Sequence, residues 1–387
     1  MLPDAANLIE RFGSPLYVYD AAQVRGAWEQ FCSSFPYRPF EVHFAIVCNK
    51  NRHLVRLLHA LGAGIHANTP GDAFAALSAG VPSDAIVYSG TNLDDADFAA
   101  LRGIRMNLDS VDQVRDYAAG RMGEEVGLRF LIDDDAHPNR IGVTAEELPE
   151  ALAIARDAGI HLTGLHMYAG TNNRSARRTL ECVDRMVAAS RQLPDLAYLD
   201  IGGGFGIAYR GDEEALDLVA LGRAVSERLE ALSTERGRRI RLIAEPGRTL
   251  VAAAGSLLCR VVSVKERGGR RYVGVDATVG NIVVESVYHS FHRLEPALPR
   301  GEALEIPTDI CGNTTHSRDF LGRNCRLPEL HRGDVLILRD VGAYGYAMSS
   351  HFLNRPRPAE VVIDAGQAHL TTRRETMDDL LATQLSL

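Results

Sequence analysis

Apolar residues over the first 250 positions alternate between short continuous runs and longer stretches with helical spacing. Leucines within residues 54–61 recur at intervals of three and four, as on the buried face of a helix. This stretch follows an apolar run at residues 40–47, and the same alternation of strand and helix continues to about residue 244. Such alternation predicts a parallel α/β architecture, and the number of units favours a closed (β/α)8 barrel.

The pattern changes after residue 250, where turns instead of helices separate the apolar runs. These runs predict strands at residues 257–264, 271–276, 335–339 and 359–363. A short aromatic and β-branched strand at residues 16–19 precedes the barrel and is available to pair with them. We therefore expect a (β/α)8 barrel over residues 25–250 and a second, mostly antiparallel β domain formed by residues 1–24 and 251–387.

Composition and charge exclude several classes of function. The chain has 387 residues, a formal net charge of −8 and no basic run, which argues against a nucleic-acid partner. No apolar run reaches the roughly 18 residues needed to cross a membrane, and residues 1–30 lack the pattern of a signal peptide. Six cysteines are scattered without metal-type spacing, as in reduced cytoplasmic proteins. We expect a cytoplasmic protein with a small-molecule substrate and predict no metal site.

Two glycine-containing turns carry the first chemical signal. The predicted strand at residues 197–201 runs into four glycines within residues 202–206, where bare backbone amides can surround an anion such as phosphate. The strand at residues 242–244 ends in a second turn, Glu245-Pro246-Gly247-Arg248. One such turn alone is as often a tight structural connection. Two of them suit neighbouring phosphate-facing loops at the mouth of a barrel.

With both domains placed, the chain resembles the pyridoxal-phosphate decarboxylases built on an alanine-racemase-like barrel (fold type III). This family includes diaminopimelate, ornithine and arginine decarboxylases and some carrier-protein-linked amino-acid decarboxylases. The resemblance covers residues 15–384 and rests on several motifs in order. It implies that the cofactor phosphate is bound by the two glycine turns and by one hydroxyl group, through Gly203, Gly204, Gly247, Arg248 and Thr171.

The resemblance also implies contacts to the cofactor ring. Glu245 would pair with the pyridine nitrogen, and its negative charge would raise the pKa of that nitrogen. Tyr168 stands where the family has a histidine stacked on the ring, a replacement that resembles the carrier-protein-linked branch. Tyr344, in a Gly-Ala-Tyr sequence of the second domain, matches a tyrosine that contacts the cofactor. Without the resemblance, Tyr344 would be interpreted as a core aromatic residue.

The catalytic positions depart from the family pattern. The first barrel strand of the family carries a lysine that forms a Schiff base with the cofactor, but Val47 occupies that position here and has no nitrogen. Lys50 lies three residues later, and on a continuing strand its side chain would point to the opposite face. His66 stands where the family has an acid near the lysine. We therefore expect that Val47→Lys alone would bury an ammonium group without a counter-charge.

A segment near residue 317 resembles the one that the family supplies across a dimer interface. Thr315 replaces the proton-donating cysteine, and a threonine hydroxyl is a far weaker acid than a thiol. His316 follows it, and the acid of the family pattern is retained as Asp319. The resemblance implies a homodimer with two shared sites, whose candidate catalytic residues are Thr315, His316, Asp319, His66 and Lys50.

The sequence leaves three functions open. The first is an amino-acid decarboxylase that binds pyridoxal phosphate without a lysine bond, or through Lys50, and acts on an amino acid or a carrier-linked derivative. The second is a protein of the same fold that binds pyridoxal phosphate or another phosphorylated ligand and uses His66, His166 and His316 as acid–base groups or metal ligands. The third is an inactive paralogue that regulates an active relative through mixed dimers. The retained phosphate motif favours the first.

Overall fold

The computed structural model describes residues 4–132, 140–283 and 290–385. Its contacts divide the chain into two compact units. The barrel unit contains Arg25–Ala208 and Glu214–Leu250, and the β unit contains Met1–Val24, Tyr209–Glu213 and Val251–Leu387. The predicted fold class, a (β/α)8 barrel with a mostly antiparallel β domain, is confirmed.

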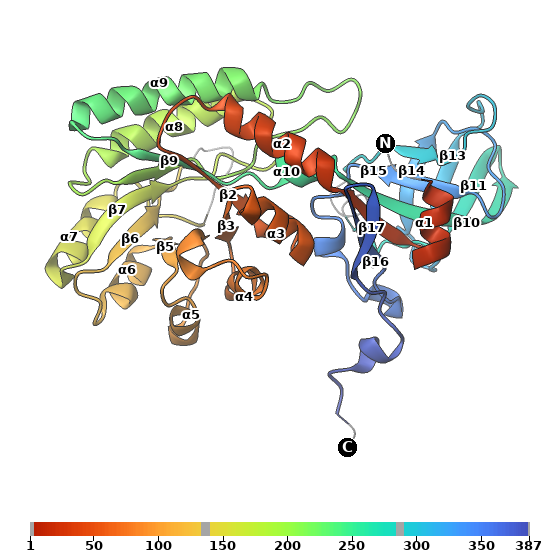
Figure 1. Ribbon diagram of the computed structural model, residues 1–387, viewed down its shortest axis with the longest axis horizontal. Coiled ribbons are helices and arrows are strands. Elements are labelled where there is room, and N and C mark those ends of the chain that lie inside the picture. Colours follow the sequence, from red (N-terminus) through yellow and green to blue (C-terminus); the bar gives the residue numbers. More distant parts are fainter. Residues whose placement is uncertain (1–3, 133–139, 284–289, 386–387) are drawn as a thin grey trace. The chain divides into compact units, whose positions relative to one another are not determined.

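Eight parallel strands close the barrel, because β9 pairs with β2 as well as with β8 (Figure 1). Each strand is short, and each is paired in parallel with the next along the chain. Their bounds are β2 Phe40–Ala45, β3 Gly64–Ala67, β4 Ile86–Tyr88, β5 Arg105–Leu108, β6 Glu125–Arg129, β7 His161–His166, β8 Tyr198–Asp200 and β9 Arg241–Ala244.

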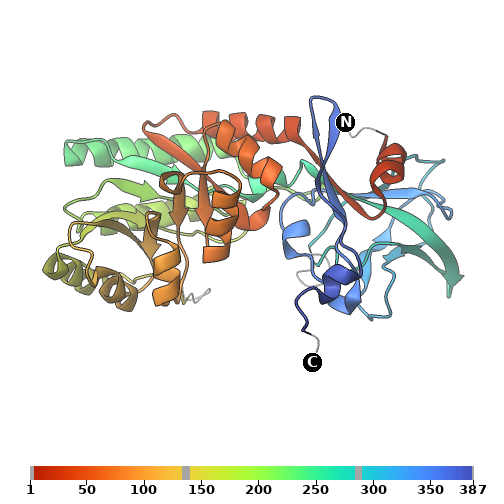
Figure 2. The ribbon, with the colours of Figure 1, turned by 60° about the horizontal axis from the view of Figure 1, so that its bottom comes forward.

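Helices cover the outside of the barrel, and α8 lies against α9 (Figures 1 and 2). Helices α3 to α9 connect successive barrel strands, while α2 precedes β2 and α10 follows β9. Their bounds are α2 Ala21–Ser34, α3 Arg52–Ala60, α4 Pro70–Ser78, α5 Asp95–Ala100, α6 Val111–Ala118, α7 Leu148–Ala158, α8 Ala176–Ser190, α9 Leu218–Arg236 and α10 Arg248–Val251. Local capping sets where α3 and α4 begin. The Asn51 side chain accepts from His53 N at 3.1 Å, and the Thr69 hydroxyl accepts from Asp72 N at 3.1 Å. Pro70 then occupies the first turn of α4, where no amide donor is required.

Side chains fill the barrel interior beneath its mouth, as is usual for this architecture. Tyr198 is buried and donates its hydroxyl hydrogen to Asn107 Oδ1 at 2.6 Å. Its ring occupies the space beside Gly164 of β7, where a Cβ atom would lie only 2.0 Å from a ring carbon. The glycine and the tyrosine are therefore complementary in this part of the barrel interior.

The β unit is built around the N-terminal strand β1 (Leu16–Asp20). This strand pairs antiparallel with β10 and parallel with β16, so the first residues of the chain complete a sheet made from its last third. Apolar side chains of α1 (Ala5–Phe12) pack against that sheet. The other strands are β10 Gly255–Arg267, β11 Arg270–Val275, β12 Leu294–Pro296, β13 Thr308–Cys311, β14 Phe320–Cys325, β15 Val335–Arg339, β16 Ala359–Asp364 and β17 Gln367–Thr372.

The sequence interpretation was wrong at the end of the first barrel strand. Strand β2 ends at Ala45, and a 3-10 turn, Ile46–Cys48, follows in place of further strand. Register explains the difference, because pairing with β3 stops at the Ala45–His66 pair and Asn51 already caps the next helix. The alternation argument that pointed Lys50 to the opposite face therefore does not apply.

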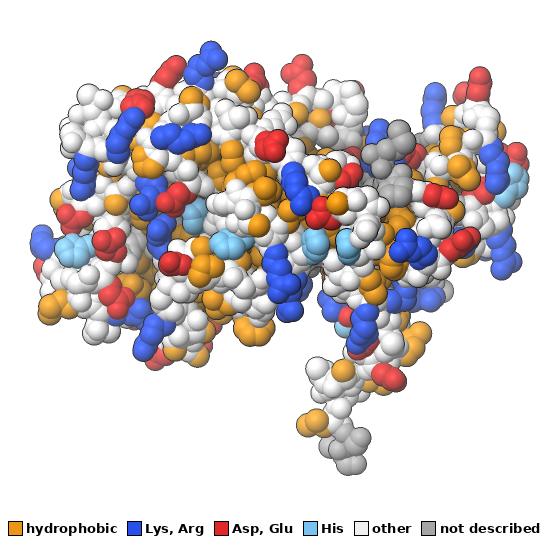
Figure 3. Space-filling model, in the orientation of Figure 1, with side chains coloured by type: hydrophobic (Ala, Val, Ile, Leu, Met, Phe, Trp, Pro, Cys, Tyr) orange, Lys and Arg blue, Asp and Glu red, His pale blue; other side chains and the backbone are white. Residues whose placement is uncertain are grey.

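Across the described ranges, no helix is both long and apolar enough to cross a membrane. On the face drawn in Figure 3, acidic and basic side chains are interspersed and no single sign dominates. This mixture agrees with the modest net charge of −8.

Candidate functional site

The two glycine turns lie side by side at the carboxyl ends of adjacent strands. Strands β8 and β9 pair in parallel, and Glu245 N donates to Gly202 O at 2.8 Å just beyond them. Ala45 N, at the end of β2, donates to Pro246 O at 3.2 Å. The ends of three neighbouring strands therefore meet at one place on the barrel mouth, where ligands bind in this architecture.

The glycines of the first turn are required by the packing of the turn itself. Gly202 and Gly204 adopt positive φ angles of 64° and 87°, which favour glycine. A Cβ atom on Gly204 would lie 1.9 Å from Gly170 O, and one on Gly203 would lie 2.5 Å from Glu245 O. A bulky residue at position 204 would therefore disrupt the turn as well as any ligand site. A substitution there cannot distinguish loss of ligand binding from loss of the turn's own structure.

Three backbone amides at these turns have no partner of their own. Within the described parts of the chain, the N–H groups of Gly203, Gly204 and Gly247 donate no hydrogen bond. Buried or half-buried amides are nearly always paired, so this group is unusual. Unpaired amides on two adjacent turns are able to bind an anion, and we call these three residues the phosphate cup.

A loop that follows β7 lies against the phosphate cup. Asn173 N donates to Gly204 O at 2.7 Å and ties this loop to the first glycine turn. The Thr171 and Tyr168 hydroxyl groups share a hydrogen bond of 2.8 Å. The Tyr168 ring is about one-third exposed, and the Arg129 guanidinium carbon lies 5.8 Å from its centroid. A hydroxyl donor and an aromatic face are therefore available beside the cup.

The Glu245 carboxyl group is buried between two histidines. His166 Nε2 and Glu245 Oε2 form a hydrogen bond of 3.1 Å, and His66 Nε2 lies 3.4 Å from Glu245 Oε1. The two imidazole rings are nearly parallel, at 22°, with centroids 6.1 Å apart. Both histidines and Glu245 have 5% exposure or less. His66 and His166 belong to β3 and β7, and Glu245 directly follows β9, so closure of the barrel brings the three together.

Burial keeps this cluster largely uncharged. It raises the pKa of Glu245 to about 8, although the positive charge of Arg129 opposes the shift. Burial lowers the pKa of His166 to about 4 and the pKa of His66 well below its ordinary value. Burial and the adjacent Glu245 raise the pKa of Asp200 well above its usual range. At neutral pH Glu245 therefore holds a proton that it can give to a basic group entering the site.

Val47 lies at the mouth but is not buried. It sits in the 3-10 turn after β2, and 39% of its surface is exposed. The expectation that a lysine here would be buried without a counter-charge is therefore wrong, since a long side chain could reach water from this position. The turn also packs against the second glycine turn, because Cys48 Sγ lies 3.0 Å from the position of a Cβ on Gly247.

The chain contains only two lysines, Lys50 and Lys265. Lys265 belongs to β10 in the β unit. Lys50 is exposed in the link between the 3-10 turn and α3, and its charge acts on Asp72 near the start of α4. Within the barrel unit, Lys50 is therefore the sole amine side chain that a carbonyl ligand could use.

The remaining catalytic candidates belong to the β unit. Asp319 is buried, and its carboxylate accepts from Val279 N at 2.7 Å and from Thr314 N at 2.9 Å. Its oxygens are thus used to hold a loop of its own unit. Thr315 is exposed and His316 is half-buried, with its Nδ1 accepting from Arg318 N at 3.2 Å.

Tyr344, the predicted second-domain cofactor contact, also lies in the β unit. Its backbone has a positive φ of 63°, which is uncommon for a bulky residue and is often found at functional sites.

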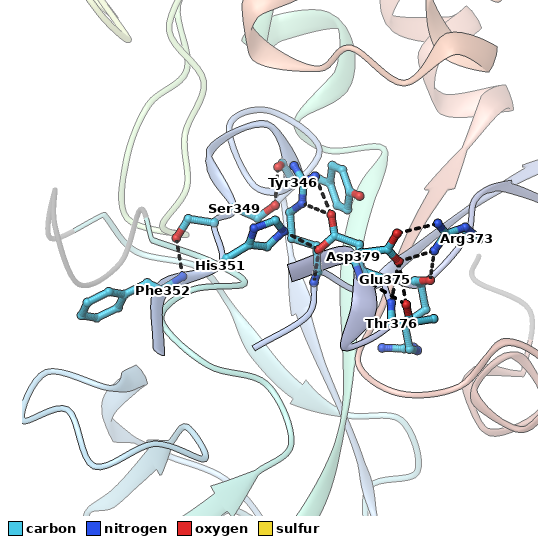
Figure 4. A network of polar contacts seen from close by, with 11 residues as sticks. Tyr346, Ser349, His351, Phe352, Arg373, Glu375, Thr376 and Asp379 are labelled. Atoms are coloured by element: carbon cyan, nitrogen blue, oxygen red, sulfur yellow. Dashed lines mark hydrogen bonds and ion pairs between the residues drawn. The ribbon is translucent and has the colours of Figure 1, made fainter. Parts of the chain in front are cut away.

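The segment that follows Tyr344 is hydrogen-bonded to the C-terminal part of the chain. His351 Nε2 and Glu375 Oε2 lie 2.6 Å apart, and Arg357 Nε donates to Glu375 Oε1 at 2.7 Å (Figure 4).

Two site residues were missed from the sequence. Arg129 is the last residue of β6, and Asp200 is the last residue of β8. Asp200 Oδ1 accepts from Gly202 N at 2.9 Å and so anchors the first glycine turn. A charged residue at the carboxyl end of a parallel strand is the signal that would have found both.

The chain is similar to known proteins in both sequence and structure. Residues 21–252 match the family model of the pyridoxal binding domain of pyridoxal-dependent decarboxylases. The chain is 33% identical to diaminopimelate decarboxylase of Methanothermobacter thermautotrophicus, over 98% of this chain and 94% of the relative. It is 32% identical to the Neisseria meningitidis protein of the same name, over 98% and 97%. The crystal structure of diaminopimelate decarboxylase from M. jannaschii with L-lysine superposes with a TM-score of 0.91 at 27% identity, covering 99% and 94% of the two chains.

The raised pKa of Glu245 gives a pH signature. Between pH 4.5 and about 8 the unfolded chain loses a proton that the folded protein keeps, so stability falls as pH rises through this window. Glu245→Gln removes that dependence. We therefore compare the free energy of unfolding of Glu245→Gln with that of the wild type at each pH. This difference should shift in favour of the variant by about 2 kcal/mol or more between pH 5 and pH 8, since each pKa unit corresponds to about 1.4 kcal/mol. Urea unfolding at several pH values measures this, with exposed Glu146→Gln as the control. A difference that does not change with pH would contradict the burial of Glu245.

Proposed function

The chain belongs to the pyridoxal-dependent decarboxylase family. We propose that it is an amino-acid decarboxylase that has Val47 at the family's lysine position and holds pyridoxal phosphate without a covalent bond to any lysine. One observation carries this proposal: three unpaired amides, of Gly203, Gly204 and Gly247, lie beside a buried, protonated Glu245. A phosphate group and a basic ring nitrogen are the two features of this cofactor that such an arrangement recognises.

The residues present fit the cofactor at its two ends. The phosphate cup offers amide donors, and Thr171 and Arg248 stand at its edge as further phosphate ligands. Glu245 faces the interior of the mouth for the ring nitrogen, and Tyr168 offers an aromatic face. Bound pyridoxal phosphate would supply an electron sink for the charge that remains when carbon dioxide leaves. Tyr344 of the β unit completes the proposed set.

Glu245 has the leading role among the protein groups. Because it is protonated at neutral pH, it can transfer a proton to the ring nitrogen and remain beside it as a carboxylate. The hydrogen bond to His166 Nε2 holds that carboxyl group in place. His66, on the other side, limits how far the carboxyl group can rotate. Arg129 favours the ionised form of Glu245 and so assists the transfer.

The substrate class follows from the family. The relatives are named diaminopimelate decarboxylases, and we propose an amino acid with a second charged group, or a carrier-linked derivative, as the substrate. We also propose a homodimer in which Thr315 and His316 of one subunit donate a proton at the site of the other. Because the Asp319 carboxylate accepts hydrogen bonds from Val279 N and Thr314 N of its own unit, its contribution would be to position Thr315 and His316.

Val47 supports a second candidate function. A valine at the lysine position together with His66 in place of an acid removes the usual covalent chemistry. A chain that binds the cofactor or another phosphorylated ligand without turnover, and regulates an active relative through mixed dimers, would retain the phosphate cup for folding or recognition. The two functions differ in turnover and not in binding.

Binding is tested with two ligands that differ only in the phosphate. We expect pyridoxal phosphate to bind about 100-fold more tightly than pyridoxal, because charge-assisted hydrogen bonds contribute about 1.5–3 kcal/mol each. Thr171→Val should weaken pyridoxal phosphate about tenfold through loss of one donor. Equilibrium dialysis measures both, and Ser175→Ala, which removes a hydroxyl from the same loop, is the matched control. Equal affinity for the two ligands would contradict the phosphate cup.

Turnover separates the two candidate functions. With pyridoxal phosphate supplied, we expect carbon dioxide release from at least one of diaminopimelate, lysine and ornithine, at a rate well above that of the cofactor alone. Glu245→Ala should reduce this rate by about 100-fold or more, because the ring nitrogen loses its charged partner. Release is measured from carboxyl-labelled substrate. Binding without release from any of the three would favour the inactive relative.

A further inference from the structure

The buried end of the site contains a set of metal-binding groups that the phosphate cup does not use. His66, His166 and Glu245 each present one ligand atom, and these atoms all lie within 4.8 Å of one another. We propose that these three residues bind a divalent transition-metal ion of the zinc type when no cofactor ring occupies the mouth. The proposed site differs from the histidine set considered from the sequence, because His316 belongs to the β unit.

The spacing of the ligand atoms suits a small metal ion. His66 Nε2 lies 3.4 Å from Glu245 Oε1, and His166 Nε2 lies 3.1 Å from Glu245 Oε2. Zinc binds imidazole nitrogen and carboxylate oxygen at about 2.0–2.2 Å, so neighbouring ligand atoms of a tetrahedral site are about 3.3 Å apart. Both nitrogen–oxygen separations are thus close to those of a tetrahedral site, and all three ligand atoms lie within 4.8 Å of one another.

The unpaired ring nitrogens of His66 distinguish a metal site from an ordinary hydrogen-bonded cluster. It is 5% exposed, yet neither Nδ1 nor Nε2 makes a hydrogen bond to any residue in the described ranges. Glu245 Oε1, which faces His66 Nε2, also has no hydrogen-bond partner there. Buried imidazole nitrogens are normally satisfied, and a metal ion would satisfy His66 Nε2 and Glu245 Oε1 together.

The donor set indicates the class of metal. Two imidazoles and one carboxylate are the ligands of catalytic zinc sites and of non-haem iron sites, which leave further positions open to water or a ligand. The surrounding charges are compatible with a dication. Asp200 and Asp109 are buried nearby with Glu245, and Arg129 is the cation coupled to this group. A bound dication would favour the ionised form of Glu245, which is the form that serves as a ligand.

Metal and cofactor would use the same carboxyl group. Glu245 cannot serve a pyridine nitrogen and a metal ion at once, so the two occupants exclude each other. The metal proposal does not depend on the proposed decarboxylase function, since it requires neither the phosphate cup nor an amino-acid substrate. A zinc titration without pyridoxal phosphate and a pyridoxal phosphate titration without zinc therefore succeed or fail separately.

Titration of the full-length chain tests the site. The protein is dialysed against a chelator, freed of phosphate esters, and titrated with Zn²⁺ by calorimetry and with Co²⁺ by visible absorption. We expect one ion per chain and a Co²⁺ spectrum of low coordination number. Loss of a ligand should weaken metal binding by about 100-fold or more. Even residues that only hydrogen-bond to metal ligands change metal affinity by about 10- to 100-fold when they are replaced. The variants are His66→Gln and Glu245→Gln.

The matched control is His161→Ala. His161 begins the same strand β7 that His166 ends, and it is exposed and paired with Asp195 at 3.1 Å. We expect unchanged metal affinity in this variant. If His66→Gln does not fold, His66→Phe keeps the ring volume and removes the ligand atom. Wild-type protein that binds no ion, or variants at His66 and Glu245 that bind as tightly as His161→Ala, would overturn the proposal.

Discussion

The burial of the Glu245 carboxyl group at the end of β9 is the constraint on which the site depends. Away from water, this group keeps its proton at neutral pH and contacts one imidazole on each side. A protonated carboxyl group can give its proton to a ring nitrogen, and an ionised one can bind a metal ion. Both proposed occupants therefore depend on the same carboxyl group, in opposite protonation states, and its position beside the two imidazoles arises from closure of the barrel.

The phosphate cup depends on the same convergence. Packing within the turn requires its glycines, since a side chain on Gly204 would overlap Gly170 O. With that packing, the amides of Gly203, Gly204 and Gly247 donate no hydrogen bond within the described parts of the chain. The contacts of the turns are made by Gly170, Glu245, Ala45 and Cys48, and not by the Val47 side chain. The proposed phosphate and ring-nitrogen contacts therefore do not require a lysine at position 47.

The barrel, the β domain and the two neighbouring glycine turns could be predicted from the sequence, because strand–helix alternation and glycine content are local signals. The end of β2 could not, since pairing with β3 rather than apolar character decides where the strand stops. The exposure of Val47 follows from that early stop. Arg129 and Asp200 were missed because the pairing that ends β6 and β8 at these charged residues is set by the closed barrel and not by local sequence. The roles of Thr315, His316 and Tyr344 stay predictions.

The link between chain and cofactor tests the central claim most directly. The protein is loaded with pyridoxal phosphate, and one half is treated with borohydride before denaturing mass spectrometry, while native spectra confirm binding. We expect an adduct in the native spectrum and the mass of the unmodified chain after reduction and denaturation, with Val47→Lys as the positive control. A reduced adduct on the wild-type chain would contradict it, and peptide mapping would place that adduct on Lys50 or Lys265, the two lysines of the chain.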